Sequence, residues 1–113
     1  MATEFCIIVE GKNDRRRLRQ VVPPTIPIGM THGLPGTDRL EALAKLAGRR
    51  QVIIFTDADS TGRRIRRMLM EVFPEAINLY TKPRFQGVEH TPLSYIEGRL
   101  RRVGVLDALP DEA

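Results

Sequence analysis

The sequence predicts an α/β domain with a mostly parallel, four-stranded sheet flanked by helices. Two continuous apolar runs, over residues 5–9 and 52–56, have the length and composition of strands that are buried on both faces. Segments with helical spacing of apolar residues separate these runs from two further strand candidates. Strands that alternate with helices are joined by right-handed crossovers, so this order indicates a mostly parallel sheet.

The segment after the first apolar run is expected to be a helix that begins at Asp14 and ends before Pro23. Asp14 is a suitable capping residue, and apolar residues recur after it at helical spacing, as Leu18, Val21 and Val22. The helix ends there because proline cannot continue it.

A short strand over residues 25–29 and a helix over residues 38–47 are expected next. Pro27 has no backbone N–H to donate, which places this strand near an edge of the sheet. A glycine-rich loop leads to Thr37, which can cap the helix, and Gly48 is suited to end it.

The helix after the second apolar run is expected to have one apolar and one basic face. It begins at Ser60 or Thr61 and ends near Phe73, before a proline. Apolar residues at helical spacing form the face that packs on the sheet: Ile65, Leu69, Val72 and Phe73. Arginines form the other face: Arg63, Arg64, Arg66 and Arg67.

A strand over residues 76–80, a basic loop over residues 82–87 and a last helix complete the prediction. Thr91 caps this helix and Pro92 takes its first position, where a missing N–H has no consequence. The acidic tail, from about residue 107 to residue 113, is expected to fray.

Length and charge limit the class of protein. We expect one domain over residues 1–113. The net charge is +4, and 15 of the 18 basic residues are arginine, whose planar fork binds phosphate, so we expect a nucleic-acid partner. With 5% aromatic residues and no tryptophan, stacking of bases on aromatic side chains is not expected to dominate.

The compartment is expected to be the cytoplasm, without a membrane partner. No segment has the length of apolar sequence that spans a bilayer, and the N-terminus does not resemble a signal peptide. The single cysteine, Cys6, lies inside an apolar run and is interpreted as a small buried residue.

Acidic residues stand where both apolar runs end. Glu10 follows the first run, and Asp57 and Asp59 follow the second. Because open α/β sheets bind ligands at the carboxyl ends of their strands, these acids are candidates for one Mg²⁺ site. Glu10 could instead serve as a general acid or base. The residues alone leave one alternative open, in which both aspartates only form the turn and cap the helix.

Two segments, Glu10-Gly11-Lys12-x-Asp14 and Asp57-x-Asp59-x-x-Gly62, resemble the two signatures of the Toprim family. Topoisomerases, bacterial primases, recombination-repair proteins, nucleases and a maturase of 5S ribosomal RNA share this domain. The resemblance covers nearly the whole chain, and Gly87-Val88-Glu89-His90 after a basic loop is most similar to the catalytic domain of the maturase ribonuclease. The maturase has a further C-terminal region, so we expect a small stand-alone Toprim protein.

The resemblance implies a Rossmann-like Toprim fold with Mg²⁺ held by Glu10, Asp57 and Asp59, for which Mn²⁺ can substitute. It also implies that Glu10 is a general acid or base, and that Gly11, Asp14 and Gly62 have structural roles at the site.

The expected function is Mg²⁺-dependent cleavage of phosphodiester bonds in RNA or DNA, with RNA slightly favoured. The alternative is a non-catalytic module that binds metal and nucleic acid, as a subunit whose protein partner supplies specificity. A nucleotide-binding domain is disfavoured because GxGxxG and GxxxxGK[ST] are absent. Tyr80 and Tyr95 match no topoisomerase nucleophile and are interpreted as packing residues. The residues expected to contact nucleic acid are Lys12, Arg63, Arg64, Arg67, Lys82, Arg84 and His90.

Overall fold

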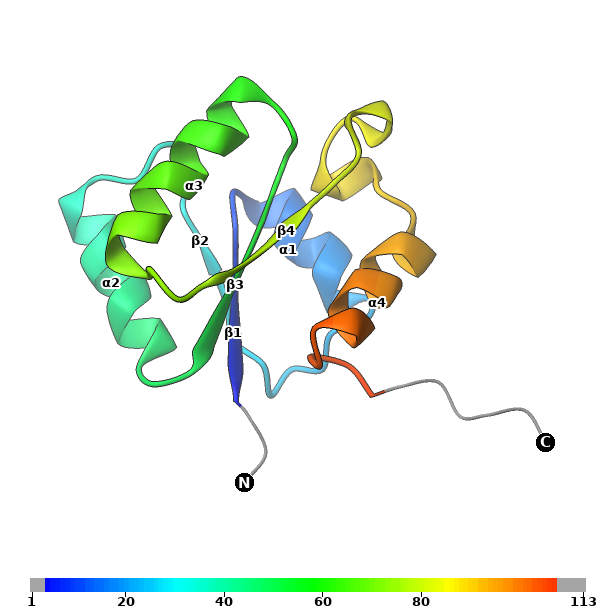
Figure 1. Cartoon of the computed structure of the whole chain (residues 1–113), viewed down its shortest axis with the longest axis horizontal. Coiled ribbons are helices and arrows are strands. Elements are labelled where there is room, and N and C mark those ends of the chain that lie inside the picture. The colour runs from blue at the N-terminus through cyan, green and yellow to red at the C-terminus, as the bar shows by residue number, and fades with distance from the viewer. Residues whose placement is uncertain (1–3, 108–113) are drawn as a thin grey trace.

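The computed structural model describes residues 4–107, and its centre is a sheet of four parallel strands (Figure 1). The strands are β1 (Phe5–Val9), β2 (Ile28–Met30), β3 (Gln51–Thr56) and β4 (Ile77–Tyr80), in the spatial order β2-β1-β3-β4. Every pair of neighbours is parallel. The predicted α/β class and its parallel four-stranded sheet are therefore confirmed.

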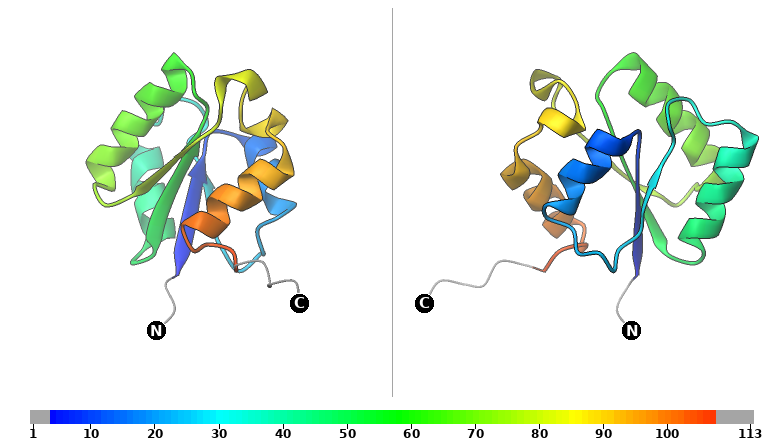
Figure 2. Two further views of the ribbon diagram at one scale, coloured as in Figure 1. Left: turned by 45° about the vertical axis from the view of Figure 1, so that its right-hand side comes forward. Right: turned by 180° about the vertical axis from the view of Figure 1, so that it is seen from behind.

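Helices cover both faces of the sheet (Figure 2). On one face lie α1 (Lys12–Arg19) and α4 (Leu93–Arg102), and on the other lie α2 (Thr37–Ala47) and α3 (Ser60–Val72). Two short 3₁₀ helices, η1 (Pro83–Phe85) and η2 (Val88–His90), interrupt the segment between β4 and α4 that the sequence predicts as a loop.

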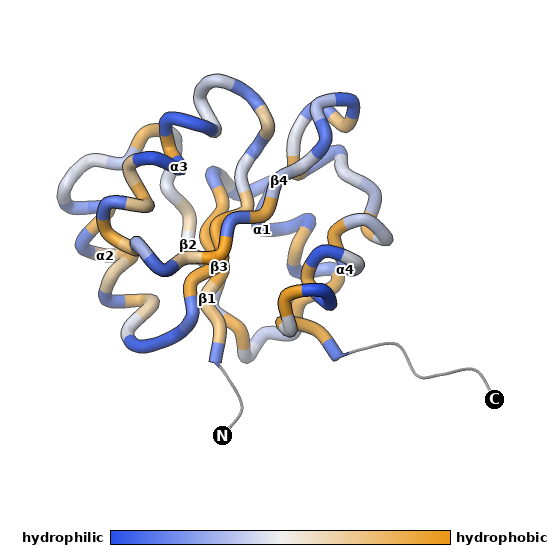
Figure 3. Tube along the Cα trace, in the orientation of Figure 1, coloured by the Kyte–Doolittle hydropathy of each residue, from blue (hydrophilic) through white to orange (hydrophobic). Residues whose placement is uncertain are grey.

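The core consists of two apolar layers because successive residues of a strand point to opposite faces. Ile7, Val9 and Phe55 pack toward α1 and α4, while Ile8 and Ile54 pack toward α2 and α3. The strands are accordingly the most apolar segments of the chain (Figure 3).

Cys6 is fully buried, as predicted, and burial raises the pKa of its thiol to about 11.

The boundaries of the first helix and the second strand differ from the prediction. The helix α1 begins at Lys12, so Asp14 lies in its first turn and Gly11 occupies the capping position. The strand β2 begins only after Pro27. The Pro27 carbonyl accepts the Ile7 N–H, but proline has no N–H of its own to donate to a neighbouring strand. As predicted, this strand is at an edge of the sheet.

Two helices have their capping residue one position away from the predicted one. The first residue of α2 is Thr37 itself, with Gly36 at the cap. In α4, Pro92 takes the capping position predicted for Thr91. Thr91 is buried instead, and its hydroxyl donates to the Gly87 carbonyl at 2.7 Å.

The predicted faces of α3 need two corrections. Val72, expected in the buried stripe, is 37% exposed near the end of the helix. Arg66, expected on the basic face, is only 6% exposed, because its position lies one turn from Gly62 and faces the sheet.

The connections reverse direction between β1 and β3. From β1 the chain crosses through α1 to β2 on one side, and from β3 it crosses through α3 to β4 on the other. The carboxyl ends of β1 and β3 therefore form the point where open α/β sheets bind ligands. Within residues 4–107, no helix combines the length and apolar character needed to cross a bilayer.

Candidate active site

Glu10 and Asp57 line one hollow at the carboxyl ends of β1 and β3. The hollow has a volume of about 540 Å³, and both carboxylates are half-buried. Lys12, Asp14 and Glu89 line it as well. A larger hollow of about 940 Å³ lies at the amino ends of the strands, which is the edge that α/β sheets do not use for ligands.

The loop before η2 holds the Asp57 carboxylate in place. The Val88 N–H donates to Asp57 Oδ1 at 2.8 Å. Gly87 has φ +106°, and a Cβ atom there would lie 3.2 Å from both carboxylate oxygens of Asp57. A side chain at position 87 would thus be strained and would press on the carboxylate.

Asp59 is the cap of α3. Its Oδ1 accepts the Gly62 N–H at 2.6 Å, its side chain is exposed, and it does not line the hollow. Gly62 is buried, and a Cβ atom there would overlap the Asp57 carbonyl oxygen. The capping role left open by the sequence is therefore present for Asp59, and Gly62 permits the close approach of the helix to Asp57.

Burial and neighbouring acids raise the pKa of Glu10. Burial is the largest cause, and the charges of Asp57, Asp14 and Asp59 each add to it. The four carboxylates therefore interact electrostatically across the hollow and the start of α3.

Asp14 is 9% exposed, and its carboxylate accepts the Gly11 N–H at 3.0 Å. Burial raises the pKa of Asp14 to about 6, with Asp57 and Glu89 adding to the shift and the Gly11 N–H opposing it. A Cβ atom at Gly11 would meet nothing within 4 Å, so the role of Gly11 here is to donate its N–H.

The acids do not form a ready-made metal cage. Among residues 4–107, no three His, Cys, Asp or Glu side chains are gathered closely enough to hold a metal ion.

Residues 5–89 match the family model of the Toprim domain.

The chain belongs to the Toprim domain family.

Relatives of this Toprim domain include a solved structure and a ribonuclease. The structure of a small TOPRIM domain protein from Bacillus stearothermophilus superposes with a TM-score of 0.78, at 32% identity, over 91% of this chain and 87% of that one. The uncharacterized protein YusF of Bacillus subtilis is 32% identical over 90% of this chain and 70% of its own length. Ribonuclease M5 of Streptococcus pneumoniae is 31% identical over 86% of this chain. The match spans 58% of the length of that ribonuclease.

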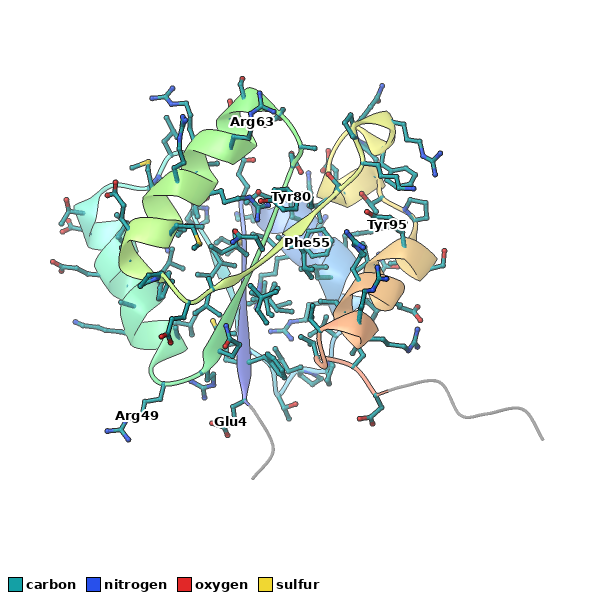
Figure 4. All side chains as sticks on the ribbon, in the orientation of Figure 1. Glu4, Arg49, Phe55, Arg63, Tyr80 and Tyr95 are labelled. Carbon is teal, nitrogen blue, oxygen red and sulfur yellow. The ribbon has the colours of Figure 1, made fainter. Side chains whose placement is uncertain are left out.

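Lys12 is the one predicted nucleic-acid contact that lines the hollow between Glu10 and Asp57. Lys12 is exposed at its rim. Lys82 and Arg84 are exposed at η1, and the α3 arginines Arg63, Arg64 and Arg67 are exposed as well. Figure 4 shows Arg63 near the start of α3, at the end of the molecule toward which β3 runs.

His90 lines a second, smaller hollow of about 260 Å³ with Arg16 and Arg17. This hollow shares Asn13 and Glu89 with the acidic one. The His90 Nε2 atom lies 3.2 Å from Glu89 Oε1.

Sequence reasoning did not find the contacts that fix Asp57. Gly87 and Val88 lie 30 or so positions further along the chain, and the only sequence signal for this contact was the Gly87-Val88-Glu89-His90 segment.

The structural role of Arg66 was also missed. Its guanidinium donates to Thr56 Oγ1 at 2.6 Å, Asn78 Oδ1 at 2.7 Å and the Leu79 carbonyl at 2.7 Å, so it joins α3 to the end of β3 and to β4.

Proposed function

We propose that this Toprim domain cleaves phosphodiester bonds of nucleic acid where β1 and β3 end, with Mg²⁺ as cofactor and Mn²⁺ able to replace it. One observation carries the proposal: Glu10 and Asp57 follow two neighbouring central strands and line the same hollow. The similarity to Ribonuclease M5 supports a nuclease activity and favours RNA over DNA as substrate.

The donor atoms at this end of the sheet suit a hard divalent cation. Mg²⁺ takes oxygen ligands and is usually bound by one or two carboxylates together with substrate phosphate. Within residues 4–107, Asp57 and Asp59 each use Oδ1 to accept a backbone N–H, which leaves Oδ2 of each for a cation. We assign the metal to these two aspartates, and Glu10 either completes the shell or transfers the proton. A bound Mg²⁺ stabilises negative charge on phosphoryl oxygens.

Glu10 is the residue that we assign to proton transfer. Its raised pKa means that its carboxyl group binds a proton at a higher pH than an ordinary glutamate. A carboxylate with this property, beside the phosphate to be cleaved, can accept the proton from the attacking water, while the leaving oxygen takes its proton from solvent.

The cations predicted from the sequence are assigned to the substrate backbone. Lys12 at the rim of the hollow would contact the phosphate next to the cut. Further phosphate contacts are assigned to Arg63, Arg64, Arg67, Lys82, Arg84 and His90. Such contacts position a nucleic acid without reading its sequence.

A module that binds metal and nucleic acid without cleaving is the second candidate. One observation favours it: Asp59 has a structural reason to be aspartate, as the cap of α3. In that case a protein partner would supply substrate specificity.

Incubation of labelled structured RNA, single-stranded DNA and duplex DNA with Mg²⁺, Mn²⁺ or EDTA separates the two candidates. We expect metal-dependent cutting of RNA that Glu10→Gln slows by about 100-fold or more. Glu41→Gln, an exposed acid on α2, serves as the control and is expected to cut normally. Binding of all three substrates without cutting, with either metal, would instead support the binding module.

A further inference from the structure

Two residues that line the acidic hollow, the one shared by Glu10 and Asp57, have an unusual backbone conformation. His32 and Gln86 both have φ +56°, in the left-handed region that residues with a side chain seldom adopt. At the other positions of positive φ within residues 4–107 the chain has glycine, which adopts this conformation without strain: Gly33, Gly48, Gly87 and Gly104. The two positions that keep a side chain therefore both border the acids.

The backbone attaches His32 and Gln86 to the two acids. The His32 N–H donates to the Glu10 carbonyl at 2.8 Å. Gln86 directly precedes Gly87, where a Cβ atom would lie 3.2 Å from the Asp57 carboxylate oxygens. His32 follows β2 and Gln86 follows β4, which are the two edge strands, whereas the acids follow the central strands β1 and β3. The segments after all four strands thus contribute to one hollow.

The side chains of His32 and Gln86 are available to a ligand. Both are exposed, and within residues 4–107 neither side chain forms a hydrogen bond or an ion pair with another residue. A left-handed backbone lowers the stability of the fold at a residue with a side chain, and no such contact offsets that cost here. Residues held in this way are typical of functional sites, so we look for their partner in the ligand of the hollow.

Both side chains can donate a hydrogen bond to phosphate. An imidazole has at least one N–H in either protonation state, and a carboxamide has an NH₂ group. Phosphate oxygens accept such hydrogen bonds, which fix the position and orientation of a nucleic acid. The carboxylates of Glu10 and Asp57 repel a phosphate that no cation shields, so donors beside each acid would hold the chain that leads to and from the cut.

We propose that His32 and Gln86 bind the backbone phosphates on either side of the scissile phosphate. The substrate strand crosses the carboxyl ends of the sheet along the order β2-β1-β3-β4, with the scissile phosphate at Glu10 and Asp57. This inference rests on the proposed function, to which it adds the path of the substrate and two residues that bind it. RNA and DNA both carry these phosphates, so the contacts position the strand without selecting between the two.

Substitution by glycine tests the proposal because it separates binding from folding. His32→Gly and Gln86→Gly each remove the side chain and relieve the backbone strain, so the temperature of thermal unfolding should not fall. Binding is measured in Mg²⁺ by fluorescence anisotropy, with both variants made in Glu10→Gln protein, where cutting is slow. The probes are labelled structured RNA, single-stranded DNA and duplex DNA. Each glycine variant should weaken binding of the tightest probe by about 5-fold or more.

Two kinds of control accompany these variants in the same Glu10→Gln protein. His32→Asn and Gln86→Asn keep a side chain that can donate, and asparagine tolerates the left-handed conformation, so both should lose less affinity than the glycine variants. Thr25→Gly removes an exposed side chain from the turn before β2, at the amino ends of the strands, and should bind like the parent protein.

Binding by either glycine variant within about 2-fold of the Glu10→Gln parent would overturn the proposal. A fall in the temperature of unfolding would also overturn it, because the side chain would then be needed for the fold. Failure of the proposed nuclease would look different: the wild type would not cut in Mg²⁺, while the losses of binding in the glycine variants would persist.

Discussion

At the scale of residues, backbone N–H groups hold the acids of the candidate site. Val88 donates to Asp57, Gly62 to Asp59 and Gly11 to Asp14. The sequence was sufficient to predict which acids stand at the strand ends, because apolar runs stop there. It could not predict their donors, because the contact between residues 57 and 88 depends on how a distant loop returns to the sheet.

Asp14 should make the free energy of unfolding depend on pH. Its pKa is about 6 in the folded protein against 3.8 ordinarily, so between these values the folded state holds a proton that the unfolded chain has lost. Stability should therefore fall as pH rises through this window. Asp14→Asn retains an acceptor for the Gly11 N–H, and should raise the free energy of unfolding at pH 7 by about 1–3 kcal/mol, with a smaller effect near pH 4.

Urea denaturation in EDTA at both pH values measures this effect. Asp38→Asn, an exposed acid in the first turn of α2, provides the control. If the wild type and Asp14→Asn had equal free energies of unfolding at pH 7, ionisation of Asp14 would not destabilise the folded protein.

Gly62 and Gly98 should respond in opposite ways to the same substitution. In Gly62→Ala the new methyl group would overlap the Asp57 carbonyl, which should lower the free energy of unfolding by about 1–3 kcal/mol. Gly98 lies in α4 with open space around it, and Gly98→Ala should raise stability by about 0.5–1 kcal/mol. Thermal denaturation of the pair checks this, and a tolerated Gly62→Ala would contradict the close approach of α3 to Asp57.

At the scale of elements, α3 links the fold to the site. Its N-terminal cap is a candidate metal ligand, one face packs on the sheet, and its exposed arginines point to solvent. Periodicity predicted the length of the helix and most of its apolar stripe. It assigned Arg66 to the wrong face because a charged residue at a helical position is usually exposed, and only the acceptors at the ends of β3 and β4 make its burial possible.

Arg66 and Arg67 should therefore separate stability from nucleic-acid binding. Arg66→Ala leaves buried acceptors on Thr56 and Leu79 without their donor, and should cost about 2–4 kcal/mol of stability. Arg67→Ala should change stability by less than about 0.5 kcal/mol because the side chain is exposed. Chemical denaturation of the two variants makes the comparison. Equal stability of both would contradict the buried position of Arg66.

At the scale of the whole molecule, parallel strand order and the reversal of crossovers bring the acids together. Parallel pairing follows from the alternation of strands and helices, which is why the fold class could be predicted from the sequence. The reversal depends on the strand order β2-β1-β3-β4, which alternation alone does not determine. The exact limits of β2 and the 3₁₀ turns could not, since they depend on Pro27 meeting β1 and on the path of the loop over Asp57.

The excess of positive charge should make nucleic-acid binding strongly dependent on salt. For a single strand, the slope of log affinity against log salt concentration should fall by about 0.7 for each phosphate-contacting cation that is removed. A triple variant of Arg63, Arg64 and Arg67 to alanine should thus reduce the slope by up to about 2. Titrations at several salt concentrations measure it, with Lys45→Ala on α2 as the control. An unchanged slope in the triple variant would show that the α3 arginines do not contact the phosphates of the nucleic acid.

The single-turnover rate of RNA cleavage in Mg²⁺ shows whether the carboxylates at the ends of β1 and β3 form a nuclease site. Asp57→Asn is the decisive variant because its side-chain oxygen can still accept the Val88 N–H while the negative charge is lost. We expect a folded protein that cleaves RNA about 100-fold or more slowly than the wild type, with Glu41→Gln unaffected. Cleavage by Asp57→Asn at the wild-type rate would contradict it.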